Sequence, residues 1–201
     1  MVKYQKIVLA TSNQGKVKEL TALLQPLNIE LIPPSAFNIP DADETGLTFI
    51  ENAIIKARHA SQLSGLPALA DDSGLAVAAL HGAPGIHSAR YAGDHATPQV
   101  HIEKLLTAMR EVPTEKRQAE FHCVLALMTS PDDPTPIICH GRWQGMVLST
   151  PSGQQGFGYD PIFYVNTEQK SAAELTSSTK NKISHRGQAL RQLLSLLAEK
   201  S

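Results

Sequence analysis

Short apolar runs and helically spaced apolar positions alternate along the first part of the chain. Residues 6–11 form an apolar run that stops at a turn-forming cluster of Ser, Asn, Gln and Gly, as a β-strand would. An apolar stripe at helical spacing follows and predicts a helix; its members are Val17, Leu20, Leu23, Leu24 and Leu27. Residues 29–32 predict a second strand, and a loop rich in Pro and Asp, residues 33–46, comes after it.

Three later helices carry start signals. Thr48 and Glu51 have the spacing of a capping box, in which each side chain accepts a hydrogen bond from the backbone N–H of the other residue. Thr97 followed by Pro98 is an N-cap with proline at the first helical position. Ser184 precedes a final helix whose leucines keep strict helical spacing.

The remaining strands are predicted from apolar runs around turns. Residues 119–128 and 136–140 flank a turn at residues 130–134 and predict an antiparallel hairpin, with further strands at 142–148 and 161–165. Strands and helices that alternate early, followed by a strand-rich middle, predict an α/β fold with a mixed sheet.

Charge and apolar content limit the class of protein. The 201 residues include 18 Lys and Arg against 19 Asp and Glu, so the net charge is 18 − 19 = −1, unlike the basic surface that grips nucleic acid. No apolar run approaches the roughly 20 residues that cross a bilayer, and the amino terminus does not resemble a signal peptide. Cys123 and Cys139 stand in apolar runs and are interpreted as buried, reduced thiols. We expect one soluble, cytoplasmic domain, residues 1–201, with neither a nucleic-acid polymer nor a membrane among its partners.

Two acidic clusters could hold a cation. Asp71-Asp72-Ser73-Gly74 follows an apolar run at residues 66–70, and adjacent carboxylates at a strand end repel each other unless a cation or solvent relieves them. Such oxygen ligands suit Mg²⁺, which binds through one or two carboxylates and the phosphates of a substrate; an acidic surface turn is the alternative. Asp41, Asp43 and Glu44 form the second cluster, for which a solvated loop is the alternative.

The loop from Thr11 to Lys16 joins a strand to a helix. Backbone N–H groups and the positive end of the helix dipole suit a phosphate there, and Lys16 adds a cation. The loop lacks the first glycine of the P-loop motif, and Val17 follows the lysine, so it is not that motif. A turn that needs Asn and Gly only for its geometry is the alternative.

Two later segments could meet the base of a nucleotide. Residues 153–161 interleave glycines with Phe157 and Tyr159, whose rings could lie on a planar base or pack against the core. His185 and Arg186 stand in the first turn of the final helix, where positive side chains oppose the dipole, so we expect an anion nearby.

Together these motifs resemble the inosine triphosphate pyrophosphatase family, also described as non-standard purine nucleoside triphosphate pyrophosphatases or dITP/XTP pyrophosphatases. The resemblance runs nearly end to end over six ordered blocks. They are Thr11-Ser-Asn-Gln-Gly-Lys16, Glu44-Thr-Gly-Leu-Thr-Phe-Ile-Glu-Asn-Ala53, Ala70-Asp-Asp-Ser-Gly-Leu75, Pro84-Gly-Ile-His-Ser-Ala-Arg90, Gly156-Phe-Gly-Tyr-Asp-Pro161 and Ser184-His-Arg-Gly-Gln-Ala-Leu190.

The resemblance implies a two-lobed α/β fold with a long mixed central sheet flanked by helices, a substrate cleft between the lobes, and a homodimer. It also implies Mg²⁺-dependent hydrolysis of the triphosphates of inosine, deoxyinosine and xanthosine (ITP, dITP and XTP) to monophosphate and pyrophosphate, which cleanses the nucleotide pool.

The resemblance further assigns roles to residues. Glu44, Asp71 and Asp72 would hold Mg²⁺, and Asp72 would be the base for the attacking water. The triphosphate would lie on Thr11, Ser12, Asn13, Gln14, Gly15, Lys16 and Lys56. The base and sugar would lie on Ser73, Phe157, Gly158, Tyr159, Asp160, Lys180, His185 and Arg186.

Two positions depart from the family pattern, and two other functions stay open. Ser12 stands where the family more often has Gly, and His87 where it often has Tyr; neither departure removes a charged group that the chemistry requires. One alternative function is a non-catalytic nucleotide-binding or sensing module, although carboxylates that face a polyanion would gain it little without a metal. The other is a pyrophosphatase for modified pyrimidine nucleotides.

Overall fold

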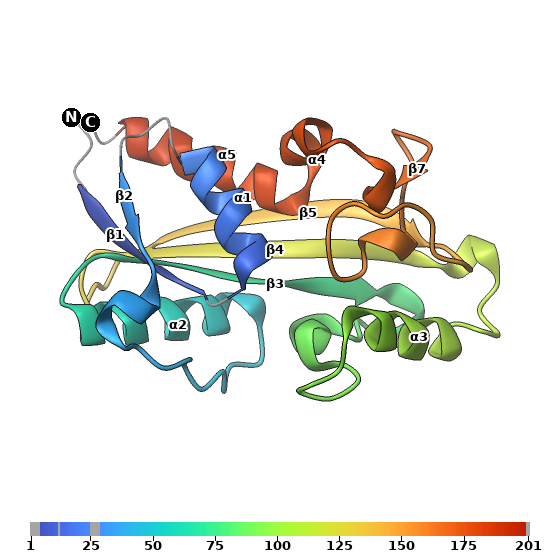
Figure 1. The fold of residues 1–201 in the computed structure, drawn as a ribbon, viewed down its shortest axis with the longest axis horizontal. Coiled ribbons are helices and arrows are strands. Elements are labelled where there is room, and N and C mark those ends of the chain that lie inside the picture. The colour runs from blue at the N-terminus through green and yellow to red at the C-terminus, as the bar shows by residue number, and fades with distance from the viewer. Residues whose placement is uncertain (1–4, 12, 25–28, 200–201) are drawn as a thin grey trace. The chain divides into compact units, whose positions relative to one another are not determined.

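The computed structural model describes residues 5–11, 13–24 and 29–199, and within them seven strands form one sheet (Figure 1). The strand order is β2-β1-β3-β4-β5-β6-β7. The strands are β1 (Lys6–Ala10), β2 (Glu30–Ile32), β3 (Ala68–Val77), β4 (Gln118–Met128), β5 (Ile137–Val147), β6 (Phe163–Val165) and β7 (Lys170–Ser171). β1 is parallel to β2 and β3, whereas β6 is antiparallel to β5 and β7, so the sheet is mixed, as predicted.

Helices flank the sheet, which confirms the predicted α/β class. They are α1 (Gln14–Leu24), α2 (Phe49–Ser64), α3 (Pro98–Ala108), α4 (Ser177–Ile183) and α5 (His185–Glu199). None of the helices in the described part of the chain has the length and apolar character that a membrane crossing requires.

The chain divides into two compact units. The first comprises Met1–Asp72, Cys123–Gly141 and Arg186–Ser201, and the second comprises Ser73–His122 and Arg142–His185. β3, β4 and β5 each contribute residues to both units.

In the first unit, sheet residues alternate between two apolar layers. Leu69 of β3 packs with leucines of α1 and α5, together with alternate residues of β4, which are Cys123, Leu125 and Leu127. Ala68 and Ala70 pack with alanines of α2, as do the other β4 residues of this segment, which are Val124, Ala126 and Met128. Therefore α2 covers one face of this part of the sheet, and α1 and α5 cover the other (Figure 1).

The start of α2 follows the predicted capping pattern in part. The Thr48 side chain accepts a hydrogen bond from the Glu51 N–H at 3.2 Å, as expected. The Glu51 carboxylate accepts from the Leu47 N–H and the Thr48 hydroxyl, both at 2.9 Å. The backbone that leads into α2 is therefore tied to the first turn of the helix one residue earlier than predicted.

The second unit has an aromatic core. Phe121 of β4 lies 4.6 Å from Phe163 and 6.3 Å from Trp143 between ring centroids. α3 contributes Ile102 and Leu105 to this core. The buried Arg117 donates to the carbonyl of Met109, the C-cap of α3, over 2.8 Å, so that carbonyl is satisfied inside the protein.

Two predicted strands have other limits in the structure. The run at 66–70 does not end before the acidic pair, because β3 continues through Asp71 and Asp72 to Val77. The separate strands predicted at 136–140 and 142–148 are one strand, β5, because the buried Gly141 does not interrupt it. α4 and β7 were not predicted, since both are too short to carry an apolar period.

Candidate active site

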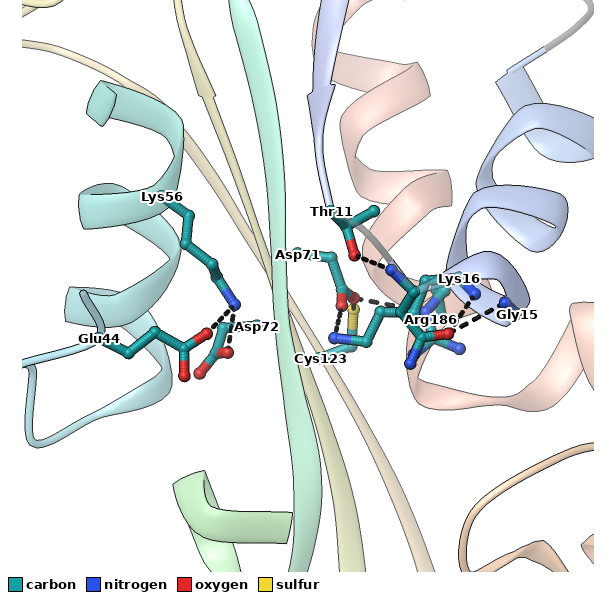
Figure 2. Close-up of polar contacts among 10 residues, drawn as sticks. Thr11, Gly15, Lys16, Glu44, Lys56, Asp71, Asp72, Cys123 and Arg186 are labelled. Carbon is teal, nitrogen blue, oxygen red and sulfur yellow. Dashed lines mark hydrogen bonds and ion pairs between the residues drawn. The ribbon is translucent and has the colours of Figure 1, made fainter. Parts of the chain in front are cut away.

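Asp71 lies at the centre of an ion-pair cluster on the α1 and α5 side of β3 (Figure 2). Its side chain is fully buried; Lys16 of α1 forms an ion pair with its Oδ1, and the Nε of Arg186 lies 3.4 Å from its Oδ2. Burial alone would raise the pKa of Asp71, but Lys16 and Arg186 outweigh it and hold that pKa well below its usual range. Asp71 is therefore a buried anion that forms ion pairs with two cations, each of which lies in the first turn of a helix.

A thiol completes this cluster. Cys123 of β4 donates its S–H to the Oδ2 of Asp71 over 3.0 Å. Burial, and then the negative charge of Asp71, raise the pKa of the Cys123 thiol well above its usual range, so the group keeps its proton. The sequence predicts only a buried, reduced thiol at Cys123, because no local signal reveals that β4 is the neighbour of β3.

The loop before α1 is closed by its own hydrogen bonds. Asn13 Oδ1 accepts from the N–H groups of Gly15 at 3.0 Å and Lys16 at 3.2 Å, and the Thr11 hydroxyl accepts from the Asn13 N–H at 3.3 Å. Asn13 is thus the cap of α1, and it occupies two donors that the sequence suggested for phosphate. Ser12 lies outside the described residues, and the side chain of Gln14 is likewise not described.

A second cluster lies on the α2 side of β3 (Figure 2). Lys56 of α2 places its Nζ 3.0 Å from Glu44 Oε1 and 2.5 Å from Asp72 Oδ1. Burial alone would lower the pKa of Lys56, but the carboxylates of Asp72 and Glu44 raise it above its usual value. Burial raises the pKa of Asp72, and the charge of Lys56 opposes only part of that effect.

The structure does not bring the three expected metal ligands together. Asp71 faces α1 and α5 while Asp72 faces α2, because successive residues of a strand point to opposite faces of its sheet. Among the residues that the structure describes, no group of three or more His, Cys, Asp or Glu side chains is arranged to hold a metal ion.

Glu44 and Asp72 nevertheless fit a divalent cation. Both offer carboxylate oxygens on the α2 side, and Asp72 Oδ2 is buried without a hydrogen-bond partner among the described residues. A buried oxygen without a partner is costly, and a cation that accepts oxygen ligands would satisfy it. Mg²⁺ is suited to such a site, because it binds proteins through one or two carboxylates.

In the second unit, Asp160 connects two of the residues expected at the base. Its Oδ2 accepts from the Phe157 N–H at 2.8 Å and pairs with Lys180 Nζ at 2.7 Å. The same Nζ lies 5.0 Å from the centre of the Phe157 ring, which is 36% exposed. Asp160 and Lys180 are themselves buried, so they support a partly exposed aromatic ring.

The other residues expected at the base have varied surroundings. The Tyr159 ring is buried and its hydroxyl donates to the Ser88 carbonyl at 3.0 Å, which favours a packing role. The His185 ring is stacked on Phe121 at 4.7 Å and 8°, whereas Arg186 belongs to the Asp71 cluster of the first unit. Ser73 is partly buried on β3 directly after Asp72, and Gly158 has a left-handed backbone with φ of 61°.

Comparison with known proteins gives matches over nearly the whole chain. The sequence profile of the Ham1 family matches residues 7–196. A dITP/XTP pyrophosphatase of Vibrio cholerae is 57% identical over 195 residues, which cover 97% of this chain and 98% of that protein. The dITP/XTP pyrophosphatase of Escherichia coli (strain K12) is 56% identical over 193 residues, which cover 96% and 98%.

Solved structures agree with the fold. A HAM1 protein from Coxiella burnetii superposes with a TM-score of 0.91 at 56% identity and covers 96% of this chain and 98% of its own. The Staphylococcus aureus Ham1 protein superposes with a TM-score of 0.87 at 38% identity and covers 98% of this chain and 100% of its own.

Proposed function

The chain belongs to the Ham1 family, and from that premise we propose that it hydrolyses non-standard purine nucleoside triphosphates to nucleoside monophosphate and pyrophosphate. Curated relatives at 56–58% identity over nearly the full chain carry the name dITP/XTP pyrophosphatase, which supports this substrate class. The observation that carries the proposal is the pair of oppositely charged clusters on the two sides of β3.

The charge of one cluster suits a triphosphate, and the charge of the other suits a metal cation. In the described ion pairs of the first cluster, the two cations Lys16 and Arg186 meet the one anion Asp71, and this excess of positive charge favours a triphosphate. In those of the second cluster, the two anions Glu44 and Asp72 meet the one cation Lys56, and this excess of negative charge favours a cation. We assign Mg²⁺ to Glu44 and Asp72, and Asp71 to the phosphate-binding cluster. When bound, Mg²⁺ would neutralise the charge that develops on the phosphates.

Asp72 is assigned the proton-accepting role. Lys56 holds one of its oxygens at 2.5 Å, so the carboxylate has a set orientation, and the other oxygen remains for water or cation. Asp72 orients a water and takes its proton as the water oxygen bonds to phosphorus. The anhydride bond between the α- and β-phosphates breaks, and pyrophosphate leaves with the electron pair of that bond.

The second unit is assigned the base. The exposed part of the Phe157 ring can stack on any purine, so the ring gives affinity without selectivity. Selectivity requires hydrogen-bond donors, because inosine and xanthosine carry an oxygen acceptor at position 6 where adenosine carries an amino donor. Lys180, held beside that ring by Asp160, is a donor of this kind. A pocket that leaves such a donor unpaired can reject adenine by about 10⁴–10⁵, whereas size alone gives about 10–200.

A panel of nucleoside triphosphates with pyrophosphate as the readout tests the proposal. We expect release of pyrophosphate from ITP, dITP and XTP, little from ATP, and none after chelation of Mg²⁺. Tight binding of ITP without hydrolysis would support the sensing alternative instead. Fastest turnover of a modified pyrimidine nucleotide would support a pyrophosphatase for such nucleotides. Equal efficiency on ATP and ITP would contradict the proposed selection of the base by hydrogen-bond donors.

We also propose a homodimer, which follows from the family resemblance alone. Light scattering at micromolar concentration should then give twice the mass of one chain, and the mass of a single chain would exclude it. An enzyme that removes aberrant nucleotides is useful where polymerases draw on the nucleotide pool, so we place its action in the cytoplasm.

A further inference from the structure

We propose that Cys123 is a positioning residue whose thiol holds Asp71 in the orientation that presents Lys16 and Arg186 to a triphosphate. This inference rests on the proposed function only in the identity of the anion. It concerns a contact between β3 and β4 that lies wholly within the first unit.

Asp71 acts through its partners. Its side chain is 0% exposed, whereas the Lys16 side chain that pairs with it is 15% exposed. A ligand can therefore meet Lys16 but not the carboxylate that holds it. The position of the Lys16 ammonium thus depends on where the Asp71 carboxylate is fixed.

Among the described contacts, three side chains hold the carboxylate. Lys16 binds Oδ1, and Oδ2 is shared between Arg186 Nε at 3.4 Å and Cys123 Sγ at 3.0 Å. Of these three donors, only the thiol is attached to the sheet, because Lys16 lies in α1 and Arg186 in α5. Cys123 therefore ties the anion to β4 and leaves the charge of the cluster unchanged.

The side of β4 that carries Cys123 explains why its thiol reaches the anion. Cys123, Leu125 and Leu127 alternate along β4 and pack in the same layer as Leu69 of β3. Asp71 follows Leu69 by two residues and so continues this layer. A polar group at position 123 thus lies where the apolar layer gives way to the ion pairs. A neutral donor fits this position because the buried Asp71 carboxylate is tolerated only when its oxygens accept hydrogen bonds.

The chain offers a matched control in its second cysteine. Cys139 of β5 is buried in the same apolar layer, and burial is the only cause that raises its pKa, to about 11. Replacement of either cysteine by alanine removes the same atoms from the core. Only the replacement at position 123 also removes a donor from Asp71.

Binding of inorganic tripolyphosphate by calorimetry tests the inference without catalysis. We expect Cys123→Ala to weaken this binding about three- to ten-fold, the range of one ordinary hydrogen bond, because the thiol is a weak donor. Cys123→Ser, which keeps a donor on a shorter bond, should restore most of the loss, and Cys139→Ala should bind like the natural protein. If Cys123→Ala does not fold, Cys123→Val fills the volume without a donor and replaces it.

A double-mutant cycle separates positioning from stability. If Cys123 acts through the Asp71–Lys16 pair, Cys123→Ala should have little further effect on binding in a Lys16→Ala background. Additive effects, natural affinity in Cys123→Ala, or a serine variant no better than alanine would each overturn the inference. Failure of the natural protein to bind tripolyphosphate would overturn it as well. Absence of pyrophosphate release from ITP would instead refute only the proposed function.

Discussion

Asp71 and Asp72 are adjacent and chemically identical, yet their carboxylates meet opposite conditions. Two cations and a thiol surround Asp71 and hold its pKa below the usual range. Asp72 forms an ion pair with Lys56, and burial raises the pKa of Asp72. The first residue is suited to remain a permanent anion, and the second has an oxygen left for chemistry. The two positions should therefore respond differently to the same substitution.

Asp72→Asn should reduce kcat for ITP by about 10²–10⁴, because the amide cannot accept the proton of the attacking water. The shape of the side chain is kept, so thermal unfolding should show a folded protein. Asp71→Asn is the matched control: it should lower the free energy of unfolding by about 3 kcal/mol, because it breaks a buried ion pair and leaves two cations without their anion. A folded Asp72→Asn variant with natural kcat would remove Asp72 from the mechanism.

At the scale of elements, close packing explains a glycine of the acidic motif. A Cβ on Gly74 of β3 would lie 2.4 Å from the Gly85 carbonyl oxygen and 2.5 Å from the Ser88 hydroxyl. That hydroxyl also accepts a hydrogen bond from the Leu75 N–H at 2.9 Å. Gly74 therefore lets β3 lie against the short helix Gly85–Arg90, which is a packing role.

The loop that carries Phe157 offers a comparison of two glycines. Gly156 and Gly158 both have left-handed backbones, with φ of 78° and 61°. A Cβ on Gly156 would lie 2.1 Å from Asp160 Oδ2, whereas one on Gly158 would meet nothing within 4 Å. Only the first would displace the carboxylate that holds Lys180 and the Phe157 N–H.

We therefore expect Gly156→Ala to raise KM for ITP roughly tenfold or more, the scale of losing a charge-assisted hydrogen bond. Gly158→Ala should change KM little and cost about 1 kcal/mol of stability, from backbone strain alone. Steady-state kinetics and urea unfolding of both variants provide the measurement. Equal effects of the two substitutions on KM would show that the Asp160 contacts do not support the base.

At the scale of the whole molecule, three strands join the two units. β3, β4 and β5 each pass from one unit to the other, so neither unit is a continuous stretch of chain. If one unit unfolded, part of β3, β4 and β5 would unfold with it, and the rest of these three strands would remain in the other unit. Whether the two units unfold together tests the prediction of one domain, residues 1–201.

We expect one cooperative unfolding transition. The only tryptophan, Trp143, belongs to the second unit, and the two buried cysteines belong to the first. Tryptophan fluorescence and thiol labelling in urea should therefore report the two units separately, with coincident midpoints if they unfold together. Midpoints that differ beyond the error of the fits would show two independently stable units.

The local features of the protein could be predicted from its residues alone. Apolar periods located α1 and α5, and start signals located α2 and α3, because both kinds of signal are properties of neighbouring residues. Ordered motifs along the chain indicated the family, to which the chain belongs. The residue types in those motifs, carboxylates, lysines and glycines, already indicated phosphate and cation chemistry before any contact was known.

Which of those groups lie in contact could not be predicted from the residues and follows from the folded chain. Arg186 reaches Asp71 across 115 positions and Cys123 reaches it across 52, distances that no local pattern spans. The division of the acidic pair between two faces requires that β3 run on through it, whereas the sequence predicted the end of a strand there, with an acidic surface turn as the alternative. The physical reason is that periodicity records which residues are buried, whereas their partners depend on strand order and on which helix covers which face.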